Sequence, residues 1–374
     1  MKTSEPTKKN KLFLHQFESV LPAVCLEQEQ AAQTLSQILV KNALTDKTAA
    51  DRWVSKFGVK PGLIEKRWFE SLELAGNSRD INEKARFFLD RTLEVFRKWY
   101  PDAQSSHPDH LVHVTCTGYY APSSAQRIVN ERKWNTETEI THAYHMGCYA
   151  SIPSIRIAEG VAHARLAHSP DQAVTIDIAH NELCGLHTNP ADLSAEQIVV
   201  QTLFADGHIK YTLQDERTAR LTSKRAFELV AHQEWQIEDS FDDMSWAPAQ
   251  WGMKMSLQRA VPEKIGQSLM SFLESLAKKA GYSIETLLKE ALFAVHPGGP
   301  KIIDRVRDLL ELKDSALEAS VKVLRERGNM SSATLPHIWK NILDNEHNQN
   351  QLVVSLAFGP GLTIFGSVFR LQQF

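Results

Sequence analysis

Residues 145–162 read HMGCYASIPSIRIAEGVA, and this stretch predicts a tight turn that leads into a helix. Apolar or small side chains recur at helical spacing and mark one face, at Ile152, Ile155, Ala158 and Ala162. Because proline fits only the first turn of a helix, Pro153 sets the helix start near residue 151. Cys148 then lies just before the helix N-terminus, and Gly147 permits a sharp entry.

This position predicts chemistry for the Cys148 thiol. Unpaired backbone N–H groups and the positive end of the helix dipole favour a thiolate, so we expect a lowered pKa. A thiol in that state is a nucleophile. The alternative is a small buried apolar residue, the usual place of a free cysteine. We interpret Cys25, Cys116 and Cys184 as structural or pocket-lining.

Composition excludes several classes of protein. The chain has 374 residues, 43% hydrophobic and 23% charged, with a formal net charge of -3. This balance gives no general attraction to nucleic acid or to an anionic membrane. No apolar stretch is long enough to span a bilayer, and the first 24 residues make a poor signal peptide. Four cysteines without a CxxC pair do not form a disulfide scaffold, which predicts a cytoplasmic protein.

The order of the predicted elements indicates an α/β layered fold. Strands are expected at 111–116, 173–179 and 209–213, with helices at 28–42, 81–99, 122–134 and after residue 196. The second half repeats this plan after a polar, Trp-rich segment at 235–260. Its expected elements are helices at 262–280, 300–312 and 315–327, a strand at 291–295, and strands at the C-terminus. We therefore predict two duplicated halves, 1–220 and 221–374.

A second motif, FAVHPGGPKIID, occupies residues 293–304. The strand ends at His296, a Pro-Gly-Gly turn follows, and Pro300 opens a helix. Ligand-binding groups of α/β folds gather at this end of a strand, which makes His296 a candidate catalytic residue. The alternative is a histidine that only satisfies local hydrogen bonds.

A third motif, RGNMSSA, occupies residues 327–333. Gly328 suits the left-handed position that ends a helix, and Ser331 or Ser332 is expected to cap the next helix. Asn329 is then fixed in a tight turn, from which its amide could donate a hydrogen bond to a developing oxyanion. The alternative is a turn asparagine with a local backbone role.

Together these motifs resemble the chalcone/stilbene synthase or type III polyketide synthase family, and the match looks more like its bacterial members. The resemblance spans roughly residues 110–374 and rests on Gly147-Cys148, LFADG at 203–207, HPGGP at 296–300, GNMSS at 328–332 and FGPGLT at 358–363. It implies a thiolase-like fold with five layers, αβαβα, built from two halves. It also implies a homodimer.

The resemblance assigns roles to the candidate residues. Cys148 matches the acyl-accepting nucleophile, and His296 and Asn329 match the pair that binds the thioester carbonyl. The implied reaction is a decarboxylative Claisen condensation of an acyl-CoA starter with malonyl-CoA, followed by closure to a pyrone or resorcinol. His296 would help to hold Cys148 as a thiolate. The resemblance implies no cofactor or metal, and no carboxylate base is needed because loss of CO₂ generates the carbanion.

The same alignment implies a substrate pocket. Phe204 matches a gatekeeping phenylalanine, and Met255 stands where a second gatekeeping aromatic is expected. Further pocket-lining positions are Cys116, Thr117, Cys184, Trp246 and Ser331. Separately, Arg52, Lys56 and Lys60 recur at four-residue spacing and could bind the CoA phosphates. Their alternative is a solvated basic face.

Other functions remain open on the sequence. A zinc site is one, because histidines and cysteines cluster at His142, His145, Cys148, His180, Cys184 and His187. A Cys-His-Asn hydrolase is another, although its local sequence signature is missing. The nearest alternative is a ketosynthase III-like enzyme that takes acyl chains from an acyl carrier protein or joins two β-ketoacyl chains. A non-catalytic thiolase-fold protein is the last.

Overall fold

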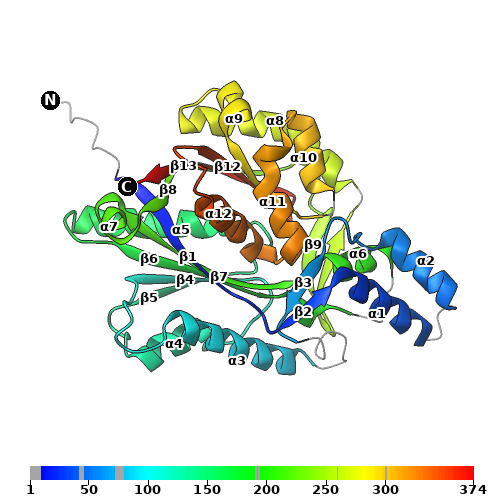
Figure 1. Cartoon of the computed structure of the whole chain (residues 1–374). Coiled ribbons are helices and arrows are strands. Elements are labelled where there is room, and N and C mark those ends of the chain that lie inside the picture. Colours follow the sequence, from blue (N-terminus) through cyan, green and yellow to red (C-terminus); the bar gives the residue numbers. More distant parts are fainter. Residues whose placement is uncertain are drawn as a thin grey trace.

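A large mixed sheet and three layers of helices form the described part of the chain. The computed structural model describes residues 10–41, 46–71, 80–189, 192, 194–258, 260–299 and 301–374. In Figure 1 the layers run from α3 and α4 at the bottom, through strands, to α5 and α12 in the middle, then strands, and α8 and α9 at the top. The predicted αβαβα architecture is therefore confirmed.

The sheet has nine strands in the described residues. In spatial order these are β11 (Leu292–Val295), β12 (Leu352–Gly359), β13 (Thr363–Gln373), β8 (Arg225–Gln236), β1 (Leu12–Val20), β7 (Asp206–Asp215), β6 (Thr175–Leu183), β4 (His110–Thr115) and β5 (Glu139–Tyr144). The pairs β4·β5, β4·β6 and β11·β12 are parallel, and the others are antiparallel.

The two halves of the sheet mirror one another about the β1·β8 pair. Moving outward from β1, the pairings are antiparallel to β7, antiparallel to β6 and parallel to β4. Moving outward from β8, they are antiparallel to β13, antiparallel to β12 and parallel to β11. This recurrence is what a duplicated plan predicts, while the division at residue 220 stays a prediction.

Helices cover the strands from three levels. The middle level holds α5 (Ser151–His168) and α12 (Thr334–Asp344), and one outer level holds α3 (Ile81–Trp99) and α4 (Ser124–Arg132). The other outer level holds α8 (Val261–Ala280), α9 (Ile284–Glu290) and α10 (Ile302–Leu310), with α11 (Asp314–Arg327) against β11 and α12. Every residue of β4 is buried, as expected for a strand covered on both faces.

Shorter elements gather at one end of the molecule, at the right of Figure 1. They are β2 (Val24–Glu27), α1 (Gln28–Lys41), α2 (Lys47–Phe57), β3 (Lys66–Phe69), α6 (Ala195–Leu203), β9 (Met244–Ala249) and β10 (Gly252–Leu257). A helix α7 (Glu216–Thr222) links the two halves, and two 3₁₀ turns, η1 (Cys184–His187) and η2 (Ser331–Ala333), follow β6 and α11.

Two segments differ from the sequence prediction. The Leu12–Val20 segment was given no strand, yet it forms β1 at the centre of the sheet. Its polar residues concealed it, since His15 is fully buried between β7 and β8 partners. The Trp-rich 235–260 segment was also given no strands, yet it contains the β9·β10 hairpin. Its two strands pair antiparallel, from Met244 with Leu257 to Ala249 with Gly252. Among the described residues, no helix is both long and apolar enough to cross a membrane.

Candidate active site

Cys148 lies in the turn between β5 and α5, three residues before the helix begins. The turn requires Gly147, which has φ +88° and whose added Cβ would lie 2.8 Å from Cδ of Pro360. An added Cβ at Gly359 would lie 2.1 Å from the ring of Tyr149. The loop between β12 and β13 thus packs directly on the Cys148 turn, which explains why an FGPGLT motif accompanies the cysteine.

The predicted lowering of the Cys148 pKa is wrong. Cys148 is only 6% exposed, and burial raises the pKa of its thiol to about 12, although a hydrogen bond from Ser331 acts in the opposite direction. Desolvation of a thiolate outweighs the favourable helix end. The resting side chain is therefore a neutral thiol that must lose its proton when it reacts.

Ser331 and Ser332 do not cap a helix, contrary to the sequence prediction. Neither η2 nor α12 has a side-chain cap; the backbone N–H of Met330 donates instead to the Thr334 hydroxyl at 2.8 Å. The Ser332 hydroxyl donates instead to Glu182 at 2.5 Å, and Ser331 lines the cavity beside Cys148. Gly328 ends α11 with a φ of +70°, in the positive region that favours glycine, although its ψ of -159° differs from that of a left-handed helical residue.

Asn329 is fixed by its backbone and by its side chain. Its N–H donates to the Leu203 carbonyl at 2.9 Å, and its carbonyl accepts from Ala205 N–H at 2.8 Å. Its amide Oδ1 accepts from Ser331 N–H at 2.8 Å, and Nδ2 donates to the Pro297 carbonyl at 3.3 Å. One of the two Nδ2 hydrogens therefore makes only a long hydrogen bond, to the carbonyl of the residue that follows His296.

His296 follows β11 and is fully buried. Its backbone N–H donates to the Leu356 carbonyl at 2.8 Å, which extends the β11·β12 pairing by one residue. Neither ring nitrogen has a hydrogen-bond partner within the described part of the chain. Burial lowers the pKa of the imidazole to about 3, so the ring is neutral and offers one donor and one acceptor.

A chain of contacts connects these residues. Ser331 and Cys148 both line one cavity, the Ser331 backbone N–H donates to the Asn329 amide oxygen, and the Asn329 Nδ2 donates to the carbonyl of Pro297, which follows His296. Three distant motifs of the sequence therefore meet in one region, each from the end of a different element. Buried polar groups without partners are costly, so the free nitrogens of His296 mark a place that a ligand can complete.

A narrow, largely apolar cavity adjoins Cys148. All the residues that the alignment implied as pocket-lining are among its walls: Cys116, Thr117, Cys184, Phe204, Trp246, Met255 and Ser331. Their role in substrate binding stays a prediction. The walls also include residues that the sequence did not single out as pocket-lining: Gly147, His187, Thr188, Val200 and Pro360.

The polar groups of the cavity wall form hydrogen bonds within the protein. Trp246 Nε1 donates to the Cys116 carbonyl at 2.7 Å. The Thr117 hydroxyl donates to Glu182 at 2.7 Å and accepts from Leu183 N–H at 2.8 Å. What remains to face a ligand is mainly sulfur, methyl and aromatic carbon.

His187 and Glu182 are functional candidates that the motif reading missed. His187 Nε2 donates to the Thr117 carbonyl at 2.8 Å and its Nδ1 accepts from Met253 N–H at 3.1 Å, so one ring joins two pocket walls. Glu182 is fully buried behind the pocket, where it accepts from Cys116 N–H, and burial raises the pKa of its carboxyl. The sequence did point to Glu182, because a charged side chain in a buried strand is rarely found without a partner or a function.

The proposed CoA-binding residues lie on the surface. Arg52 and Lys56 are exposed on α2, and Lys60 is exposed in the turn that follows. Helix α2 packs against α6, which carries the pocket residue Val200. Binding of CoA by these residues stays a prediction. As for the zinc alternative, no cluster of three or more potential ligands occurs among the residues that the structure describes.

Comparison with known proteins identifies the family. Residues 230–372 match the model for the C-terminal domain of chalcone and stilbene synthases. A putative chalcone synthase of Bacillus subtilis (strain 168) is 26% identical over 367 residues, which cover 94% of this chain and 96% of the relative. These matches support a type III polyketide synthase. The hydrolase and non-catalytic alternatives are thereby set aside, because family members are condensing acyltransferases that use CoA thioesters.

Solved structures of type III polyketide synthases share the fold. The C-terminal domain of Steely1 from Dictyostelium superimposes with a TM-score of 0.82 at 22% identity, covering 96% of this chain and 99% of that domain. The 1,3,6,8-tetrahydroxynaphthalene synthase of Streptomyces coelicolor A3(2) superimposes with a TM-score of 0.80 at 21% identity, covering 97% of this chain and all of that one (100%).

Proposed function

We propose that this chain condenses an acyl-CoA starter with malonyl-CoA by decarboxylative Claisen chemistry and cyclises the product to a pyrone or resorcinol. The observation that carries the proposal is that Cys148 and Ser331 line one cavity, while the Ser331 N–H binds the Asn329 amide and that amide binds the carbonyl of Pro297, the residue after His296. No carboxylate base is required, since the departure of CO₂ leaves the electron pair that forms the new bond.

The first step loads the starter. Cys148 Sγ attacks the thioester carbonyl, the Sγ proton passes to the neutral imidazole of His296, and CoA leaves with that proton as a thiol. A raised cysteine pKa and a lowered histidine pKa both keep this pair neutral between turnovers. The acyl group then occupies the cavity as a Cys148 thioester.

The second step extends the chain. Malonyl-CoA loses CO₂, and the resulting enolate oxygen accepts hydrogen bonds from Asn329 Nδ2 and from the protonated nitrogen of neutral His296. Neutral donors stabilise this charge without trapping it as an ion pair. The enolate carbon attacks the Cys148 thioester, the C–S bond breaks, and a chain two carbons longer remains on CoA. No metal or redox cofactor enters this balance.

The pocket chemistry supports an apolar starter. Trp246, Thr117 and His187 use their polar atoms within the protein, so a polar acyl chain would lose its hydration without gaining partners. An alkyl chain loses nothing there and gains contact with Met255, Cys184 and Val200. We therefore infer a fatty acyl starter.

We also infer a homodimer. Strand β5 is the outermost strand of the sheet and pairs only with β4 among the described residues, which leaves one edge free for a second copy. The cysteines Cys116, Cys148 and Cys184 are free and share one pocket, so the reaction requires a reducing compartment, and we infer the cytoplasm.

Intact-protein mass spectrometry tests the proposal. The wild-type chain, Cys148→Ala and the surface control Cys25→Ala are incubated with acyl-CoAs of increasing alkyl length, then with malonyl-CoA. We expect an acyl adduct on wild type and Cys25→Ala, none on Cys148→Ala, and polyketide lactones or resorcinols only with the first two. An adduct formed only from acyl carrier protein would support the ketosynthase alternative instead. The proposal fails if Cys148→Ala is acylated as fast as wild type.

A further inference from the structure

A buried arginine lies behind the pocket and touches no substrate-facing surface. Arg67, on β3, is only 1% exposed. Its Nε donates to Gln28 Oε1 at 2.9 Å, and its Nη1 donates to the carbonyls of Gln201 at 3.0 Å and Phe204 at 2.6 Å. Burial lowers the pKa of the guanidinium to about 9, which leaves it charged at neutral pH.

The carbonyls that Arg67 binds belong to the end of α6. The last carbonyls of a helix have no partners within the helix and carry the negative end of its dipole. A guanidinium placed there satisfies two of them at once and fixes where the chain leaves the helix. The residue at that exit is Phe204, which lines the pocket.

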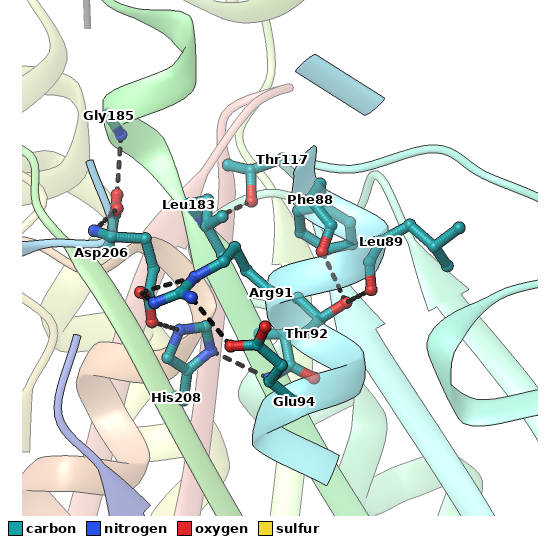
Figure 2. A network of polar contacts seen from close by, with 12 residues as sticks. Phe88, Leu89, Arg91, Thr92, Glu94, Thr117, Leu183, Gly185, Asp206 and His208 are labelled. Atoms are coloured by element: carbon teal, nitrogen blue, oxygen red, sulfur yellow. Dashed lines mark hydrogen bonds and ion pairs between the residues drawn. The ribbon is translucent and has the colours of Figure 1, made fainter. Parts of the chain in front are cut away.

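A second contact holds the far side of the same segment. The Asp206 carboxylate accepts from Glu70 N–H and from Gly185 N–H, both at 2.8 Å. Figure 2 shows the bond from Asp206 to Gly185, with Arg91 and His208 close together beneath it. Glu70 in turn binds His208 Nε2 at 3.1 Å and Arg91 at 2.7 Å. The end of β3 is therefore fixed in place. It contacts the 204–206 segment at both ends, through Arg67 at Phe204 and through Glu70 at Asp206.

The held segment also carries Asn329. Leu203 and Ala205, on either side of Phe204, exchange backbone hydrogen bonds with Asn329. Arg67 also packs against Gly328, the residue before Asn329, since a Cβ added to Gly328 would lie 2.9 Å from Arg67 Cγ. A movement of Arg67 therefore displaces Phe204 and Asn329 together.

We propose that Arg67 is a positioning residue that fixes the Phe204 ring and the Asn329 amide in one register, and so couples malonyl decarboxylation to the number of extension steps. This inference rests on the proposed condensing function. Arg67 has no part in loading the starter, since its contacts reach the Phe204 and Asn329 segment and not the Cys148 turn.

The test compares Arg67→Lys and Arg67→Met with Arg132→Lys. Arg132 is a matched control, because it also donates to carbonyls after a helix end, those of Tyr100 at 2.7 Å and Pro101 at 3.3 Å, far along the chain from the site. Three quantities are measured on each protein: the rate of Cys148 acylation, the release of CO₂ from malonyl-CoA with its kcat and KM, and the length distribution of the products.

We expect Arg67→Lys to load the starter within about twofold of wild type and to release CO₂ about tenfold more slowly with little change in KM. Its products should spread over several chain lengths, while Arg132→Lys keeps the wild-type pattern. Since Arg67→Met leaves buried carbonyls without a donor and is the variant at risk of not folding, Asp206→Asn provides a second disturbance of the same segment and should show the same split.

The outcomes separate this inference from the proposed function. Absence of a Cys148 adduct on wild type would overturn the function itself. If wild type loads and extends normally while folded Arg67→Lys and Asp206→Asn give unchanged CO₂ release and one product length, the positioning role of Arg67 is wrong. An equal loss of loading and extension also overturns it, because a general structural defect predicts that result.

Discussion

Asn329 and His296, the two proposed oxyanion donors, are held differently in the structure. The Asn329 amide has three protein contacts, whereas the His296 ring has none among the described residues. The histidine is therefore oriented by packing alone. A ligand oxygen between them would complete hydrogen bonds that the protein itself leaves unmade.

Removing the Asn329 amide should slow decarboxylation specifically. We expect Asn329→Ala to lower the rate of CO₂ release from malonyl-CoA about 10²- to 10³-fold, the usual effect of losing one oxyanion donor. Acylation of Cys148 should fall far less. Asn130→Ala, on the exposed face of α4, is the control and should behave as wild type. Equal rates of CO₂ release from Asn329→Ala and wild type would exclude the donor role.

Gly147 offers a test of the Cys148 turn. A methyl group there meets Pro360 at 2.8 Å on a backbone with φ +88°, so Gly147→Ala should lower the free energy of unfolding by about 1–3 kcal/mol and slow acylation. Gly160→Ala, within α5 and with nothing within 4 Å of the added Cβ, should instead stabilise by about 0.5–1 kcal/mol. Denaturant unfolding of both variants measures the difference, and equal effects would contradict the turn geometry.

The β9·β10 hairpin shows how one element closes the pocket. It supplies Trp246 and Met255, and it is tied to the rest of the wall by Trp246 to the Cys116 carbonyl and by His187 to Met253. Each of these contacts is a hydrogen bond between a ring nitrogen and a backbone group. Such contacts fix the position of the hairpin without filling the cavity beside it.

Cutting one tie should widen the pocket. Trp246→Phe keeps most of the ring volume and removes the 2.7 Å bond to Cys116, so we expect a stability loss of about 1 kcal/mol and a shift toward longer starters or products. Trp235→Phe, whose ring packs edge-on against Phe272 away from the pocket, should leave the product pattern unchanged. Chromatography of the products decides between them, and identical profiles for the two variants would contradict the role of the hairpin.

Sequence patterns predicted helices and strands wherever buried apolar residues recur at a regular spacing. The span of α3 was predicted to the residue, and α5 begins where Pro153 requires. Strand β1 and the β9·β10 hairpin were missed, because the burial of His15 and the pairing of the Trp-rich run arise from tertiary contacts that no local window of sequence contains. For the same reason the Cys148 pKa was misjudged, since the helix end is visible in sequence and the burial is not.

At the scale of the molecule, the core is unusual in its neutral histidines. Burial lowers the pKa of several imidazoles to between about 3 and 4: His15, His113, His180, His187, His296 and His337. A pKa lower in the folded than in the unfolded state means that the unfolded chain binds protons more readily. Stability from these groups is complete above pH 6.5 and is lost as the pH falls.

We therefore expect the melting temperature to fall steeply between pH 6.5 and 5. Each such histidine contributes up to about 1.4 kcal/mol per pH unit in this window. Glu70, with a pKa lowered to about 2, adds a loss below pH 4.5. Asp206, with a pKa raised to about 7, acts in the opposite direction, because its neutral form is favoured in the fold. The histidines outnumber it.

His296→Leu isolates one of these contributions. The variant should lose activity yet show a shallower dependence of unfolding free energy on pH, by about one proton, between pH 6.5 and 5. His168→Leu, exposed at the end of α5, should leave the slope unchanged. Chemical denaturation at a series of pH values gives both slopes, and a His296→Leu slope equal to wild type would refute the buried neutral imidazole.

The two backbone hydrogen bonds between Asn329 and the residues flanking Phe204 limit how this enzyme can diversify. A substitution that re-aims the Phe204 ring to admit a larger product should also shift Asn329, the proposed oxyanion donor. New product sizes should therefore arise at other positions of the cavity wall, such as Met255 on β10 and Cys184 on η1, which lie outside the segment that is hydrogen-bonded to Asn329. Natural variation and directed evolution would then share one preferred route, through the hairpin and η1 rather than through the end of α6, where Phe204 lies.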